Sequence, residues 1–114
     1  MTVDVTILVG WKEDYLYYES GYEEDTLSHD IEEAAEFLDL NADLVRDLES
    51  WDAEYQATYN PVKFRDSGFA TPDAKRDWIE RGKELSARLK RESPMVASVN
   101  YLANGSIPEH TCVF

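Results

Sequence analysis

The chain has 114 residues and a net charge of −13, with 43% apolar and 12% aromatic residues. This length predicts one domain, spanning residues 1–114, with a single hydrophobic core. The aromatic content excludes a wholly disordered chain, and the single cysteine, Cys112, excludes an intrachain disulfide. No basic region followed by an apolar run opens the sequence, and no stretch approaches the roughly 20 apolar residues of a membrane span, so we expect a cytoplasmic protein without membrane contact.

The first two predicted elements are strands. Residues 3–9 are rich in β-branched side chains that alternate with other residues, which predicts a strand. The side chains on its apolar face are Val3, Val5, Ile7 and Val9. Residues 10–14 can turn the chain, so that residues 15–19 return as the second strand of a hairpin. Residues 20–25 then form an acidic loop.

Two helices are expected next. The first helix is predicted by apolar residues at helical spacing, which are Ile31, Ala34, Ala35 and Leu38. Asn41 is suited to cap the second, which Asn60-Pro61 ends. The apolar stripe of this second helix comprises Leu44, Leu48, Trp51 and Tyr55. An acidic stripe with the same spacing comprises Asp43, Asp47, Ser50 and Glu54.

The third helix has the clearest local signal in the chain. Thr71 is suited to the N-cap, Pro72 to the first helical position and Asp73 to the positive end of the helix dipole. We expect this helix to extend to about Glu92. Gly82 lies among its inward residues, which predicts close packing against a neighbour. The inward side chains are Trp78, Leu85 and Leu89.

The last predicted strand covers residues 96–102 and is apolar enough to pair with the first. The resulting order is β-β-α-α-α-β. It indicates an α+β fold in which a small antiparallel or mixed sheet carries the helices on one face.

The negative charge is unevenly distributed along the chain. Residues 1–60 hold seventeen Asp and Glu against Lys12 and Arg46, a net charge of −15, whereas residues 61–114 hold seven acids and nine bases, a net charge of +2. Such a distribution attracts basic partners and repels polyanions, so direct binding of nucleic acid is disfavoured. A solvated surface that maintains solubility is the alternative interpretation.

Motifs for catalysis and metal binding are missing from the sequence. It contains neither a Gly-x-Ser-x-Gly elbow nor a glycine loop for phosphates. His110 and Cys112 could supply two metal ligands, but zinc sites need three or four, and His29 is the only other histidine. We therefore expect no enzymatic activity, no metal and no cofactor. The bases of the third helix alternate with acids, which is typical of a salt-bridged surface helix.

The third helix and the residues before it resemble a pattern in small uncharacterised actinobacterial proteins, in which an SGFASP turn precedes a long amphipathic helix. Here the turn reads Ser67-Gly68-Phe69-Ala70-Thr71-Pro72, followed by Trp78, Gly82, Leu85 and Leu89. The resemblance implies a capped helix and a closing strand but no activity. In size, charge and lack of catalytic motifs the chain is also similar to immunity proteins that neutralise secreted toxins.

These features predict a small acidic binding protein. We expect an immunity or antitoxin-type inhibitor that occludes a basic toxin such as a nuclease. The residues predicted to contact this partner are Tyr22, Glu23, Glu24, Asp25, Asp43, Asp47 and Glu54. The alternatives are a nucleic-acid mimic that blocks a restriction or CRISPR effector, a small structural protein and a small enzyme.

Overall fold

The fold is an α+β arrangement built on a four-stranded mixed sheet. The computed structural model describes residues 2–21, 27–63, 65 and 67–114. The sheet order is β3-β2-β1-β4. Its strands are β1 (Val3–Ile7), β2 (Leu16–Tyr17), β3 (Ser28–His29) and β4 (Val96–Tyr101). The predicted fold class is confirmed, and the structure adds β3, which is too short to leave a periodic pattern in the sequence.

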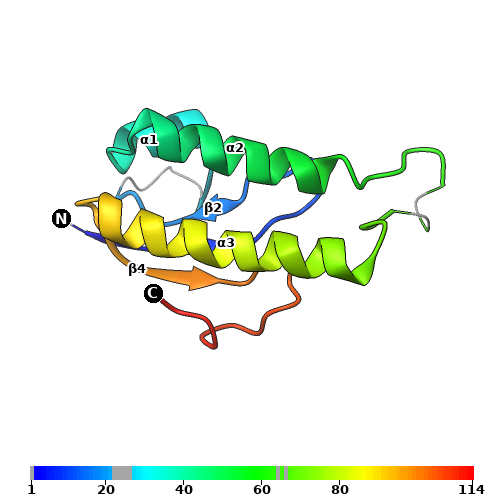
Figure 1. The fold of residues 1–114 in the computed structure, drawn as a ribbon. Coiled ribbons are helices and arrows are strands. Elements are labelled where there is room, and N and C mark those ends of the chain that lie inside the picture. Colours follow the sequence, from blue (N-terminus) through cyan, green and yellow to red (C-terminus); the bar gives the residue numbers. More distant parts are fainter. Residues whose placement is uncertain (1, 22–26, 64, 66) are drawn as a thin grey trace.

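β1 lies inside the sheet, between β2 and β4. It pairs antiparallel with β2, as expected for a hairpin, and parallel with β4, so that the first and last strands of the chain lie side by side (Figure 1). The final residues then return along the free edge of β4. Phe114 exchanges two backbone hydrogen bonds with Val99 (2.8 and 3.0 Å), so this edge is covered.

Three helices pack on one face of the sheet: α1 (Ile31–Phe37), α2 (Ala42–Gln56) and α3 (Pro72–Glu92). α2 and α3 lie side by side along the length of the molecule (Figure 1). Both predicted N-caps are confirmed, because the side chain of Asn41 accepts from the backbone N–H of Leu44, and that of Thr71 from Ala74. None of the helices in these described ranges has the length and apolar character of a membrane span.

The core lies between the helices and β1. The predicted inward residues are buried: Val3, Val5, Ile7, Val9, Leu44, Leu48, Trp51, Tyr55, Trp78, Leu85 and Leu89. Two tryptophans join α2 to α3 by a reciprocal contact. Nε1 of Trp51 donates to the carbonyl oxygen of Trp78 and Nε1 of Trp78 donates to that of Trp51, each at 2.9 Å, while the rings stack with centroids 4.6 Å apart. This contact fixes the spacing of the two helices that carry most of the ion pairs described below.

Candidate partner-binding surface

The acidic stripe predicted on α2 lies where α3 runs beside it. The side chain of Asp47 accepts a hydrogen bond from Arg88 at 2.7 Å, and Glu54 is ion-paired with Arg81. Both arginines come from α3, the basic helix of the second half of the chain. Asp43 is instead paired with Arg46 of its own helix, at 2.8 Å. The seam between α2 and α3 therefore carries alternating charge rather than a continuous row of carboxylates.

Arg88 is the central cation of this seam. Its Nε donates to Glu92 at 2.9 Å while its other end contacts Asp47, so one guanidinium holds two carboxylates. Hydrogen bonds from Arg88 and then Asn41 lower the pKa of Glu92 below its ordinary value. The arrangement locks α3 to α2 and leaves little unpaired charge at Asp47.

The predicted contact residues thus differ in their surroundings. Asp43 is the most accessible of those that the structure describes, with its side chain 73% exposed. Its ion pair with Arg46 is equally exposed, and such pairs contribute little because water screens them. Tyr22, Glu23, Glu24 and Asp25 lie outside the described residues.

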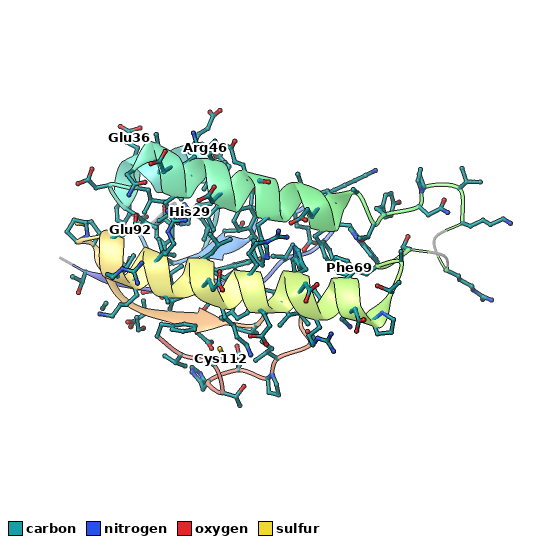
Figure 2. The ribbon with its side chains drawn as sticks, in the orientation of Figure 1. His29, Glu36, Arg46, Phe69, Glu92 and Cys112 are labelled. Carbon is teal, nitrogen blue, oxygen red and sulfur yellow. The ribbon has the colours of Figure 1, made fainter. Side chains whose placement is uncertain are left out.

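Figure 2 shows Glu36 and Arg46 at one end of the molecule, on the side of α1 and α2 that faces away from β4. α1 adds a group of exposed carboxylates at this end, and α1 itself contains no Lys or Arg. The exposed carboxylates of this segment are Glu32, Glu33, Glu36 and Asp39. Glu33 contacts Nδ1 of the buried His29 at 2.7 Å, which ties α1 to β3. The surface of α1 is therefore strongly anionic.

A second acidic cluster lies where the turn between β1 and β2 meets α2. Gln56 joins the two segments, since its Nε2 donates to the carbonyl oxygen of Gly10 at 2.9 Å and its Oε1 accepts from the backbone N–H of Lys12 at 2.8 Å. Nε2 of Gln56 also donates to Asp52 at 3.1 Å. The charge of Asp14, which belongs to this turn, acts on this carboxylate. The two charges therefore come from segments far apart in the sequence.

The electrostatics of this cluster set it apart from the seam. Partial burial raises the pKa of Asp52 above its ordinary value, the hydrogen bond from Gln56 opposes this rise, and the charge of Asp14 adds to it. Burial also raises the pKa of Tyr15, and the charges of Asp52, Glu49 and Asp14 add to that rise in this order. The charges of three carboxylates therefore act on one buried tyrosine side chain.

This cluster was not among the predicted contact residues. Glu49, Asp52 and Gln56 recur at helical spacing, which places them on one face of α2, but Asp14 belongs to a turn whose contact with that face is a tertiary feature. In the sequence, only this helical spacing indicated the cluster. Carboxylates are so abundant elsewhere in the chain that the spacing did not distinguish these residues.

Among the described residues, no group of three or more His, Cys, Asp and Glu side chains could hold a metal ion. The backbone N–H of His110 donates to the side chain of Asn100 at 3.0 Å, and Cys112 is half-buried. Both residues thus belong to the C-terminal segment that covers the edge of β4.

Residues 8–104 match the family model described as Serratia CdiI immunity protein-like. The matched range contains α1, α2 and α3 and the strands β2, β3 and β4. No curated protein matches the chain. A match of this extent covers the anionic surfaces described above as well as most of the core. The chain therefore belongs to the Serratia CdiI immunity protein-like family.

Proposed function

We propose that this chain is a contact-dependent inhibition immunity protein that binds a basic toxin, such as a nuclease, and occludes it. The observation that carries the proposal is the family match over residues 8–104. An immunity protein acts by binding, so it requires a surface complementary to its toxin rather than a catalytic centre.

The charge distribution supports a basic partner. Residues 1–60 hold seventeen carboxylates against two bases, and many of these carboxylates are exposed on α1 and α2. A nuclease grips phosphates with Lys and Arg, and the same side chains would be attracted to such a surface. Attraction of this kind mainly accelerates association and is weakened by salt.

The ion pairs along the seam determine how easily each predicted contact residue could pair with an arginine of the toxin. A toxin arginine that approached Asp47 or Glu54 would have to displace Arg88 or Arg81, which offsets what the new pair contributes. At Asp43 only the exposed pair with Arg46 is exchanged. We therefore place Asp43 ahead of the other two, together with Tyr22, Glu23, Glu24 and Asp25 of the acidic loop.

The experiment takes the product of the reading frame beside this gene as the candidate toxin domain. The domain is expressed from an inducible promoter with and without the protein, and the growth of the cells is measured. Complex formation is followed by size-exclusion chromatography and titration calorimetry. We expect restored growth and a stable one-to-one complex. Absence of both rescue and complex would contradict the proposal, and association that is insensitive to salt would contradict a basic contact surface.

The position of the contact is tested by a matched pair of charge reversals. Asp43 and Asp73 both lie in the first turn of a helix, and each is ion-paired with the arginine three residues later, at 2.8 and 2.9 Å. Their side chains are 73% and 77% exposed. Asp43→Lys should slow association at about 50 mM salt by at least about threefold. Asp73→Lys should leave the rate close to that of the wild type, and equal effects would place the contact elsewhere.

A further inference from the structure

We propose that Asp14, Glu49 and Asp52, together with the hydroxyl of Tyr15, form a cation-accepting site that receives one arginine side chain of the toxin. The inference rests on the proposed function. The turn and α2 are fixed to each other, the carboxylates have no ion pair with a Lys or Arg among the described residues, and the hydroxyl of Tyr15 is buried without a hydrogen-bond partner there.

The site is built on fixed elements rather than on a loose surface. Gln56 makes three hydrogen bonds that connect α2 with the turn between β1 and β2, to Gly10, Lys12 and Asp52. Trp11, in the same turn, donates from Nε1 to Thr58 at 3.0 Å, just beyond the end of α2. Two attachments therefore hold the turn against the helix. The two segments that carry the carboxylates therefore do not have to be brought together when a ligand arrives, which favours binding.

The site also lacks the cation that comparable carboxylates in this protein have. Asp43, Asp47 and Glu54 each have an arginine partner. In the part of the chain that the structure describes, no ion pair joins Asp14, Glu49 or Asp52 to a Lys or Arg. Asp52 is at the same time partly buried, which disfavours its charged form. These carboxylates are thus left with their mutual repulsion.

Tyr15 provides a second and independent indication. Tyr15 is only 6% exposed, and its ring packs edge-on against that of Trp51, with the ring centroids 6.1 Å apart. Its hydroxyl group is buried, and no hydrogen-bond partner for it lies among the described residues. Buried polar groups in native proteins are nearly always paired, so an unpaired hydroxyl on which the charges of three carboxylates act indicates a ligand that completes the site.

Arginine fits this combination better than lysine does. A guanidinium group presents five N–H donors in a planar fork, enough to contact two carboxylates and a phenolic oxygen together. It is also more weakly hydrated than an ammonium group, so its transfer to a partly buried site costs less. An arginine at this place neutralises the carboxylates around Asp52 and pairs the hydroxyl of Tyr15. We expect it to govern dissociation, because a desolvated pair must be broken when the complex separates.

The test compares two triple variants that change the net charge equally. The site variant is Asp14→Asn/Glu49→Gln/Asp52→Asn. The control variant neutralises three exposed carboxylates of α3 and the C-terminal segment, none of which is ion-paired among the described residues. Its substitutions are Asp77→Asn, Glu84→Gln and Glu109→Gln. Surface plasmon resonance with the cognate toxin domain at about 150 mM salt gives both rate constants, and thermal unfolding gives the melting temperature.

The site variant should bind the toxin at least about tenfold more weakly, mainly through faster dissociation, and should melt no lower than the wild type because repulsion has been removed. The control variant should bind within about threefold of the wild type. Tyr15→Phe, which removes only the hydroxyl, should also accelerate dissociation without lowering the melting temperature.

The outcomes separate the two proposals. If the wild type binds and neutralises the toxin while the site and control variants bind alike, the inference is wrong and the proposed function stands. If the wild type itself neither binds nor neutralises the toxin, the proposed function fails, and the site fails with it. If the triple variant does not fold, the single variants Glu49→Gln and Tyr15→Phe replace it. Dissociation from the toxin at the wild-type rate in both single variants would contradict the proposed arginine site.

Discussion

Replacement of Gly82 by alanine gives the sharpest test of how α2, α3 and β4 pack together. Gly82 lies in the middle of α3, where alanine would normally stabilise a helix by about 1 kcal/mol. Here the added methyl group would lie 2.5 Å from Cζ of Tyr101 and 2.6 Å from Cζ2 of Trp51, and closer still to the tyrosine hydroxyl. Ordinary carbon contacts are about 3.5 to 4.0 Å, so the overlap with both rings is about 1 Å.

Neither ring can move away without loss. The hydroxyl of Tyr101 donates to the carbonyl oxygen of Ile79 at 2.9 Å, and Trp51 is held by its hydrogen bond to Trp78. Overpacking of a rigid core costs about 1 to 3 kcal/mol. Loss of a hydrogen bond through this shift destabilises the fold by about 1 kcal/mol more, whereas the higher helix propensity of alanine stabilises it by about 1 kcal/mol. We therefore expect Gly82→Ala to lower the free energy of unfolding by about 1 to 3 kcal/mol.

Urea unfolding followed by tryptophan fluorescence measures this change. Ala53→Gly, at an exposed position inside α2, calibrates the propensity term alone and should cost about 1 kcal/mol. In a Tyr101→Leu background the alanine should cost less than in the wild type, because its nearest neighbour has been removed. A Gly82→Ala protein that is more stable than the wild type would refute the packing described here.

Two further predictions concern the core and the acidic cluster. Trp78→Phe removes the hydrogen bond to the carbonyl oxygen of Trp51 together with some buried volume. It should lower the free energy of unfolding, measured by urea titration, by about 2 kcal/mol. An unchanged urea midpoint would contradict the reciprocal contact. The raised pKa of Asp52 means that the folded state binds a proton more readily than the unfolded state, so ionisation of Asp52 destabilises the fold at neutral pH. Asp52→Asn, which keeps the oxygen that accepts from Gln56, should therefore raise the melting temperature at about pH 7, and the gain should shrink as the pH falls through the raised pKa. A variant that melts below the wild type at neutral pH would show that the charge of Asp52 is stabilising.

Much of the fold could be predicted because its signals are local. The caps at Asn41 and Thr71 depend on one side chain and the backbone three residues later. The buried face of β1 follows from alternation, and the buried stripe of α2 follows from helical spacing. Gly82 indicated a close approach, although only the structure identifies Tyr101 and Trp51 as the neighbours.

The sequence by itself determined the elements, their inward faces and an N-terminal half with a net charge of −15, because composition and periodicity act within a few residues along the chain. Only the tertiary structure decided which charges meet. The packing of α3 beside α2 pairs Asp47 with Arg88 and Glu54 with Arg81. The docking of the turn on α2 lets the charges of Asp14, Glu49 and Asp52 act on Tyr15. Those neighbours depend on how the helices and the turn are oriented, and pairs so distant in sequence leave no trace in a local pattern.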